Sequence, residues 1–357
     1  MRIGSGHIFQ NPLNKRSDLD LYQNEMHLAD LAEGLGFDSI WGVEHHFTDY
    51  TLCPDVTQWL TWVAARTEKA QIGSMVVVLP WHDPLRVAEE VAMLDTLSNG
   101  RMILGIGRGL GRVEFDGFRV SMDETRARFV ESAGMVLQGL EQGYVEGDGE
   151  FYKQPRRELR PAPFKTFRGR TYAAAISPET MKILAELGVG MLILPQKPWD
   201  QIATDLESYR STFREVQGEE APTPIVASFT YCDEDGDRAE EVMRKHMDSY
   251  YDSMLRHYEL QADHFGEAKG YEYYKDMSKA LNKYGTDSAG EFFLNLQVFG
   301  TPEQCLEKIR DTMGKTQGEH FVATFAFGGM PYEDAESSMR LFAKEVMPEL
   351  QRAAVTT

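Results

Sequence analysis

Short apolar runs alternate with amphipathic stretches along the whole chain. The runs are rich in β-branched residues and predict strands, and the stretches between them carry apolar residues at helical spacing. Such alternation is typical of a parallel sheet covered by helices, and eight rounds of it predict an α/β fold of the (β/α)8 TIM-barrel type. The predicted strands are Arg2–Phe9, Asp38–Val43, Gln71–Leu79, Met102–Ile106, Thr171–Ala175, Gly190–Leu194, Ile225–Tyr231 and His320–Phe327.

Two of the intervening helices have clear ends. The stretch Asp18–Gly34 has apolar residues at mixed three- and four-residue spacing and stops at a glycine pair around Leu35. The stretch Pro84–Leu97 has proline in its first turn and is followed by Asn99 and Gly100. Each helix leads directly into the next predicted strand, so each completes one β/α unit.

Two longer stretches interrupt this rhythm. Residues Glu146–Arg170 contain three prolines, and residues Leu260–Asn295 are rich in Gly, Tyr, Lys and Asp, so both are expected to be irregular. The second lies between the seventh and eighth predicted strands, where long loops are usually functional, and it is the candidate lid. No Pro/Gly/Ser-rich linker divides the chain, which favours a single domain over residues 1–357 with an insertion at 260–295.

Composition and charge exclude several classes of protein. The longest apolar run, Met75–Trp81, is far shorter than the roughly 20 residues that a membrane helix needs. The N-terminus has no apolar signal core, and three widely spaced cysteines give neither a disulfide framework nor a zinc pattern, so a cytoplasmic location is expected. The net charge of −19 disfavours nucleic acid and anionic lipid as partners.

Polar residues follow several predicted strands, which is where a barrel of this type assembles its site. The second strand runs into Glu44, His45 and His46. Strand alternation sends neighbouring side chains to opposite sides, so we expect one histidine to face the barrel mouth and the other to be structural. A histidine there could exchange protons during a reaction, although a hydrogen-bonded pair in the core is an equally good interpretation.

A glycine-rich segment follows the fourth strand. Glycines alternate around Arg108 between Gly105 and Gly111, which permits close backbone approach while one guanidinium reaches a phosphate. A dinucleotide fingerprint is excluded because Leu110 occupies the place of its third glycine. The plainer interpretation is a loop whose glycines only permit positive φ angles.

The fifth strand leads into a predicted helix start. Ser177 is the expected N-cap and Pro178 the first helical residue. Exposed amides at a helix start, together with the hydroxyls of Ser177 and Thr180, form a natural phosphate seat, although a plain helix cap uses the same pattern.

With these residues laid out, the sequence resembles the bacterial luciferase-like flavin-dependent monooxygenases, a family that includes the α subunit of bacterial luciferase. The order and spacing of several motifs carry the resemblance. They are Leu35–Asp38 with Trp41, Glu44–Thr48, Val78–Pro80 with His82–Pro84, Arg86–Glu90, Leu94–Asp95 with Ser98–Arg101, Gly107–Gly109, Phe118–Val120, Tyr251–Ser253, Lys269–Tyr271 and Gly300–Cys305.

The resemblance implies a site and a reaction. Reduced FMN would react with O2 through a flavin C4a-hydroperoxide and oxygenate a small apolar organic substrate. His45 would lie beside the flavin, Arg108 would meet its phosphate with Ser177 and Thr180, and a non-proline cis peptide would fall at Met75–Val76. No nicotinamide site is readable, so a separate reductase would supply the reduced flavin, and a homodimer is expected.

Three alternatives stay open at this point. A deazaflavin could replace FMN on the same fold and make the protein a hydride-transferring oxidoreductase. A non-catalytic flavin-binding subunit is disfavoured by His45. A metal-dependent barrel hydrolase could use four histidines near strand ends, although the fourth and eighth strands offer no lysine or aspartate ligand. These histidines are His7, His45, His46 and His82.

Overall fold

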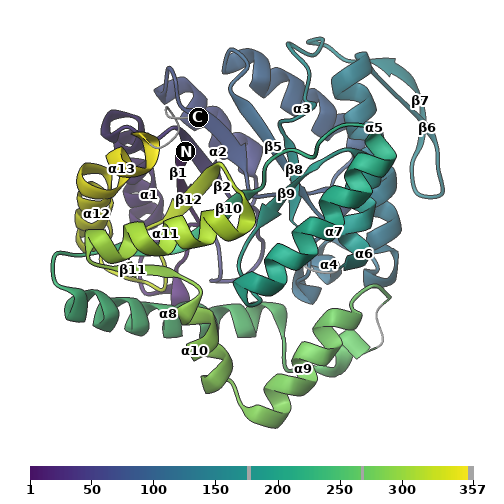
Figure 1. Cartoon of the computed structure of the whole chain (residues 1–357). Helices are drawn as coiled ribbons and strands as arrows, with labels where there is room; N and C mark the ends of the chain where they lie inside the picture. The colour runs from purple at the N-terminus through teal and green to yellow at the C-terminus, as the bar shows by residue number, and fades with distance from the viewer. Residues whose placement is uncertain (175–177, 267–268, 353–357) are drawn as a thin grey trace.

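A computed structural model describes residues 1–174, 178–266 and 269–352. Parallel strands form a closed barrel in which each strand pairs with the next, and the last strand pairs with both its predecessor and the first (Figure 1). The predicted (β/α)8 barrel is therefore confirmed, and each predicted strand contains a strand of the barrel, although the predicted strand Gln71–Leu79 is broken after Ser74. In barrel order the strands are β1 (Arg2–His7), β2 (Ser39–Gly42), β3 (Gln71–Ser74), β5 (Met102–Gly107), β8 (Thr171–Ala174), β9 (Gly190–Ile193), β10 (Ile225–Cys232) and β12 (His320–Thr324).

Helices surround the barrel and close one of its ends. The predicted helix at Pro84–Leu97 has these bounds in the structure, and the first helix ends one residue later than predicted, at Leu35 before the left-handed Gly36. The helices are α1 (Asp18–Leu35), α2 (Val56–Arg66), α3 (Pro84–Leu97), α4 (Arg112–Phe118), α5 (Thr125–Gln142), α6 (Pro178–Leu187), α7 (Trp199–Gln217), α8 (Gly236–Tyr258), α9 (Glu272–Tyr284), α10 (Asp287–Asn295), α11 (Pro302–Thr316), α12 (Tyr332–Leu341) and α13 (Met347–Arg352). Shorter turns of helix are η1 (Pro12–Asn14), η2 (Leu79–Trp81), η3 (Met122–Glu124), η4 (Asp263–Gly266) and η5 (Phe342–Val346).

The strands are buried along almost their whole length. Every residue of β10 and of β5 is buried, as expected for strands covered by side chains inside the barrel and by helices outside it. Glycine makes room for the largest side chain of the interior, because a Cβ on Gly73 would overlap the ring of the fully buried Trp41. A single apolar core therefore fixes the barrel that positions the strand ends.

The two interruptions are more regular than the sequence suggested. Within the first, an antiparallel hairpin joins β6 (Tyr144–Asp148) to β7 (Lys153–Glu158), and this two-stranded sheet tolerates Pro155 because each of its strands is an edge. Most of the second is helical, in α9 and α10. Gly285 is the C-cap of α9 and therefore marks the end of a helix, whereas Gly290 lies inside α10. The expectation of irregular structure was wrong for these parts.

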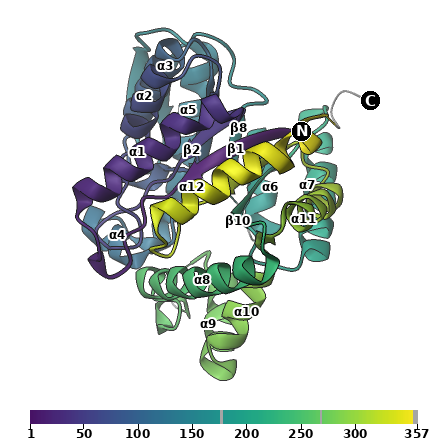
Figure 2. The ribbon, with the colours of Figure 1, turned by 90° about the vertical axis from the view of Figure 1, so that its left-hand side faces the viewer.

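The insertion between β10 and β12 covers one end of the barrel. Figure 2 shows α8 lying across that end, with α9 and α10 beyond it. Two short strands extend the sheet, β4 (Val77–Val78) beside β5 and β11 (Val298–Gly300) beside β10. None of the described helices combines the length and the apolar character needed to cross a lipid bilayer.

Candidate active site

A cavity of about 430 Å³ lies where the carboxyl ends of the strands meet α8 and α9. Its volume is in the range of sites that hold small molecules. Side chains from opposite ends of the sequence line it, including His45 after β2, Arg108 after β5, Thr324 at the end of β12 and Tyr258 at the end of α8. The position agrees with the general rule for such barrels.

His45 faces this cavity and is held by a carboxylate from α4. Its Nδ1 lies 3.0 Å from Glu114 Oε1, and the backbone N–H of His46 donates to the same oxygen at 2.9 Å. Burial alone would raise the pKa of Glu114, but attraction to His45 and hydrogen bonds from His257 and His45 outweigh it and lower the pKa to about 2. Glu114 is therefore ionised at neutral pH.

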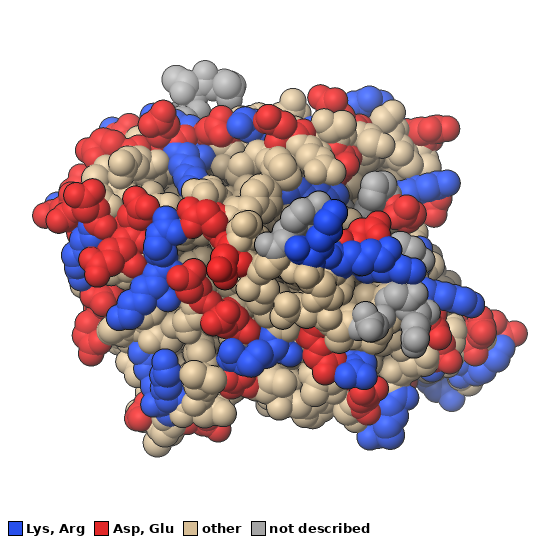
Figure 3. Space-filling model, turned by 90° about the horizontal axis from the view of Figure 1, so that it is seen from below, with Lys and Arg blue, Asp and Glu red and all other residues tan. Residues whose placement is uncertain are grey.

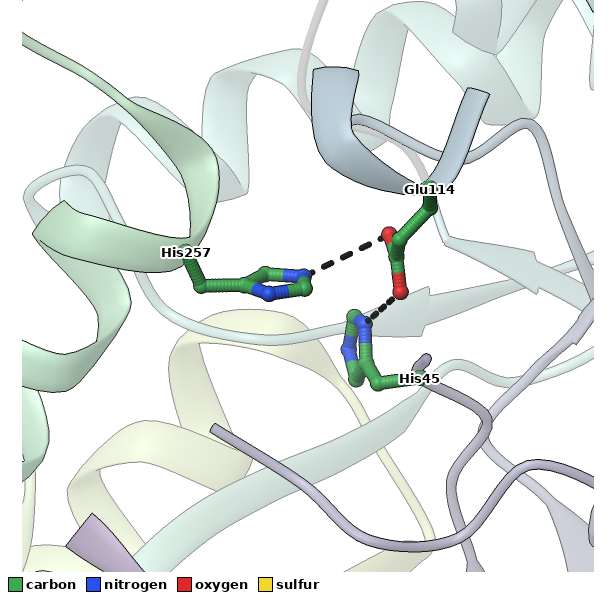
Figure 4. A group of neighbouring side chains, drawn as sticks. All are labelled: His45, Glu114 and His257. Carbon is green, nitrogen blue, oxygen red and sulfur yellow. Dashed lines mark hydrogen bonds and ion pairs between the residues drawn. The ribbon is translucent and has the colours of Figure 1, made fainter. Parts of the chain in front are cut away.

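His257 of α8 occupies the other side of the same carboxylate. Its Nε2 lies 3.4 Å from Glu114 Oε2, and its Nδ1 lies 2.7 Å from Thr48 Oγ1. Figure 4 shows His45 and His257 on the two oxygens of Glu114. Burial, reinforced by repulsion from His45, lowers the pKa of His257 despite the nearby Glu114 carboxylate, so His257 is neutral at pH 7.

A second buried carboxylate, Glu44, binds two other histidines. Its Oε1 lies 2.6 Å from His82 Nε2 and 3.2 Å from His46 Nε2, and its Oε2 accepts from the backbone of Val78 at 2.9 Å. Of the adjacent histidines, His45 lines the cavity and His46 packs behind it. The two histidines are separated as expected, but they lie beyond Gly42, the last residue of β2, so strand alternation is not the cause.

Arg108 lies at the cavity wall as expected, and a second arginine lies next to it. Arg108 Nη1 and Arg126 Nη2 both donate to the carbonyl of Gly270, at 2.8 and 3.3 Å, and Arg126 also lines the cavity. The Nε of Arg126 is buried without a hydrogen-bond partner among the described residues. Sequence reasoning missed Arg126 because it lies in the first turn of α5, away from any strand end.

The wall between these groups is formed by backbone and glycine. The peptide bond Met75–Val76 is cis, as the resemblance implies, and both residues line the cavity. Gly107 of β5 lies beside them, where a Cβ would overlap the Val76 side chain. The alternating glycines therefore serve close packing at this wall, with positive φ only at Gly109.

Of the remaining predicted phosphate residues, Thr180 lies in the first turn of α6 and lines the cavity. Ser177 lies outside the described residues. The third side of the cavity, near α8, carries three tyrosines: Tyr50, Tyr250 and Tyr258.

The histidines proposed for a metal site do not meet at one point. His7 Nδ1 contacts Glu25 at 3.2 Å, whereas His46 and His82 contact Glu44 and His45 contacts Glu114. Within the described part of the chain, only His45, Glu114 and His257 have the spacing of metal ligands, and that group includes one of the four predicted histidines.

The outer face of the lid region is mixed in charge. Figure 3 views the molecule from the side of α8, α9 and α10, and acidic and basic side chains are interspersed over it with uncharged surface between them. The positive charge of Arg108 and Arg126 is therefore a local feature of the cavity, set against a net charge of −19 for the whole chain.

Known proteins that are similar to this chain in sequence and fold include several oxygenases. The alkanal monooxygenase alpha chain of Photorhabdus luminescens is 27% identical over 339 residues, covering 94% of each protein. The structure of the monooxygenase RslO1 from Streptomyces bottropensis aligns over 98% of this chain and 99% of its own, with a TM-score of 0.75 and 26% identity.

More distant structures with the same fold belong to proteins that bind FMN or depend on F420. The oxygenating constituent of 3,6-diketocamphane monooxygenase from Pseudomonas putida, solved with FMN, has a TM-score of 0.75 at 20% identity and covers 98% of this chain and 99% of its own. An F420-dependent secondary alcohol dehydrogenase has a TM-score of 0.71 at 16% identity, covering 97% and 98%. The family model for luciferase-like monooxygenases matches residues 1–319, and the chain therefore belongs to the luciferase-like monooxygenase family.

Proposed function

We propose that this protein is a flavin-dependent monooxygenase that uses reduced FMN and O2 to oxygenate a small apolar organic substrate. One observation carries the proposal: a single cavity joins two arginines at one end to His45 at another part of its wall. A flavin mononucleotide has the matching chemistry, since it links an anionic phosphate to a flat ring that undergoes redox reactions.

The arginine end suits a phosphate. Arg108 and Arg126 share one neutral backbone carbonyl, and neither forms an ion pair with a carboxylate among the described residues. Two guanidinium groups that lack an anion are a favourable site for phosphate, which they bind in a bidentate manner. In this proposal Arg108, Arg126, Thr180 and Ser177 hold the phosphate of FMN.

The glycine-lined wall suits the ring system. Gly107 leaves the backbone of β5 bare at a place where a side chain would collide with Val76, so a planar ring can approach the wall closely. We assign Met75 and Val76 to the flavin ring. Trp81, Phe229 and Phe293 also line the cavity and give it the apolar character that fits an apolar substrate.

Reduced FMN, when bound, supplies the two electrons with which one atom of O2 enters the substrate and the other leaves as water. The chain contributes a shaped cavity, since α8 and α9 lie over the strand ends and shield it from solvent on that side. Residues 260–295 are assigned as the lid that admits substrate. His45 holds or releases a proton at Nε2, the nitrogen that does not contact Glu114.

The names of the relatives support oxygenation as the reaction. One is an alkanal monooxygenase chain and another is the oxygenating constituent of a monooxygenase that was solved with FMN. In keeping with a constituent that only oxygenates, a separate reductase supplies the reduced flavin in this proposal. We further propose a cytoplasmic homodimer.

The test is an anaerobic titration of the purified protein with reduced FMN, followed by admission of 18O2 and mass analysis of products from a panel of apolar substrates. We expect saturable binding of FMN and one labelled oxygen atom in the product. Arg108→Ala should weaken binding of FMN more than binding of riboflavin, which lacks the phosphate. Tight binding of reduced F420 with hydride transfer and no use of O2 would replace this function by the deazaflavin alternative.

A further inference from the structure

A series of polar contacts runs from the cavity past His45 into the protein. The Tyr258 hydroxyl lies 3.2 Å from His45 Nε2, and His45 Nδ1 lies 3.0 Å from Glu114 Oε1. Beyond the carboxylate, His257 Nε2 lies 3.4 Å from Glu114 Oε2, and His257 Nδ1 lies 2.7 Å from Thr48 Oγ1. Three chain segments that are far apart in sequence therefore meet in one series.

The ionised carboxylate fixes the direction of its hydrogen bond with His45. Glu114 has only acceptor atoms, so the nitrogen of His45 that faces it, Nδ1, carries the hydrogen. Neutral His45 then has its lone pair at Nε2, where the Tyr258 hydroxyl donates to it. The arrangement has the same logic as a hydroxyl, imidazole and carboxylate triad, with tyrosine in the position of the hydroxyl.

Tyr258 is suited to pass a proton without becoming charged. It lines the cavity from the last turn of α8, so its hydroxyl lies between His45 and a ligand in the cavity. Burial, and then repulsion from Glu114, raises the pKa of Tyr258 well above its usual value. The residue therefore stays neutral at pH 7.

Tyr50 and Tyr250 also line the cavity, but neither has a hydrogen bond to His45 among the described residues. The hydroxyls of Tyr50 and Tyr250 lie 2.9 Å from each other. The ring of Tyr50 packs against His45 with centroids 4.9 Å apart, but the hydrogen bond to His45 Nε2 comes from Tyr258. This difference gives a matched control within the same cavity.

We propose that Tyr258 is a catalytic residue that carries a proton between His45 and an oxygen atom of the bound substrate, and this role rests on the proposed oxygenase function. In the forward direction the Nε2–H bond of the His45 imidazolium breaks and a new O–H bond forms on Tyr258. The original O–H bond of Tyr258 breaks at the same time, and its proton joins the substrate oxygen. Tyr258 is neutral before and after, and His45 ends as neutral imidazole. Glu114 is a positioning residue that fixes the His45 tautomer.

Other titratable groups surround this path and enter any pH profile. Tyr50 and His257 pack against His45, with ring centroids 4.9 and 5.0 Å away. Asp49 acts on His257 and forms an ion pair with Arg256 at 3.6 Å. Tyr250 and Tyr274, which also line the cavity, add to burial in raising the pKa of Tyr258.

The experiment compares Tyr258→Phe with Tyr250→Phe, each of which removes one hydroxyl from the cavity and keeps the ring. For Tyr258→Phe we expect kcat to fall by about 100-fold or more, the range of general acid–base catalysis. The pH profile of kcat should change shape and the solvent deuterium isotope effect should be lost, while FMN affinity is kept. Tyr250→Phe should retain the wild-type pH profile and the isotope effect.

A second readout needs neither flavin nor substrate. Imidazole 15N spectra of the histidine-labelled protein should show His45 as the Nδ1–H tautomer, and its Nε2 signal should shift in Tyr258→Phe but not in Tyr250→Phe. If Tyr258→Phe fails to fold, Glu114→Gln should disturb the same tautomer and the same pH profile. An unchanged pH profile in folded Tyr258→Phe would overturn the proposal. Absence of FMN binding in the wild type would instead overturn the proposed function, and the catalytic role of Tyr258 with it.

Discussion

Two buried carboxylates, Glu44 and Glu114, have almost the same surroundings and different connections. Each contacts two imidazoles and one backbone N–H. In the described part of the chain the two histidines on Glu44, His46 and His82, do not lead on to a hydroxyl in the cavity, and the third contact of Glu44 is with the backbone of Val78 in the barrel wall. One histidine on Glu114 continues to a tyrosine hydroxyl in the cavity. The comparison suggests a rule for such pairs. A histidine held by a buried carboxylate can exchange a proton with a ligand only when its other ring nitrogen faces the cavity.

The largest expected effect separates the histidines of the two centres. His45→Asn should lower kcat by about 10²- to 10⁴-fold, because it removes the group that holds the proton at the cavity. His82→Asn breaks the same kind of contact on Glu44 and should leave kcat unchanged, since His82 lies outside the cavity lining. Steady-state rates at saturating substrate measure both. Equal losses in the two variants would contradict the distinction.

The next effect concerns the contribution of Glu44 to the stability of the fold. In Glu44→Gln a single amide oxygen must replace two carboxylate oxygens that accept from His82, His46 and Val78. Each buried donor left without an acceptor costs about 1–3 kcal/mol, so we expect the free energy of unfolding to fall by about 3 kcal/mol. Urea unfolding followed by circular dichroism measures it. A change within about 0.5 kcal/mol, the usual size for surface substitutions, would show that this centre contributes little.

A comparable change in the free energy of unfolding is expected at low pH from Glu114. The pKa of Glu114 is about 2 in the folded protein against 4.5 in the reference state, so its stabilisation is complete above pH 4.5 and is lost as pH falls towards 2. In that window it contributes a slope of up to about 1.4 kcal/mol per pH unit to the free energy of unfolding.

Glu114→Gln should remove this contribution, so its unfolding free energy should depend less on pH than that of the wild type. Urea midpoints between pH 5 and pH 3 give the two slopes. Identical slopes would mean that the carboxylate of Glu114 is not held ionised by its histidines, and the tautomer argument for His45 would lose its basis.

The smallest effect is expected at the cavity wall formed by Val78 and Gly107. Val78, which donates to Glu44, pairs in register with Gly107 of β5. Gly107→Ala would force a methyl group against Val76, at a cost of about 1–3 kcal/mol for overpacking, and should weaken FMN binding. Gly134→Ala, in the open environment of α5, is the control and should leave FMN affinity unchanged. Equal affinities in both variants would argue against a flavin at this wall.

Much of the barrel was predictable because its signals are local. A strand that is covered on both faces must be apolar throughout, and the helix caps at Pro84 and Gly36 depend only on neighbouring residues. Two parts were predicted wrongly for different reasons. The hairpin at 144–158 is exposed and contains Pro155, whereas α9 is clearly amphipathic and was overlooked because the stretch was judged by its overall content of Gly, Tyr, Lys and Asp.

The site was predictable only in part. His45 and Arg108 follow strands, and strand ends converge in any barrel, so position alone placed them at the cavity. Arg126 and His257 come from helices, and no local pattern distinguishes them from other polar residues on those helices. Ser177 lies outside the described residues, so its role stays a prediction.

The sequence by itself determined the barrel, the strand ends and the histidine at the mouth, because hydrophobic periodicity specifies which face of each element is buried. Only the tertiary structure decided what that histidine contacts. Glu114 is 69 positions away from His45 and Tyr258 is 213 positions away, so their meeting depends on how α4 and α8 pack over the barrel. A local pattern shows that a side chain points inward, but the opposing side chain is chosen by the packing of elements distant in the chain.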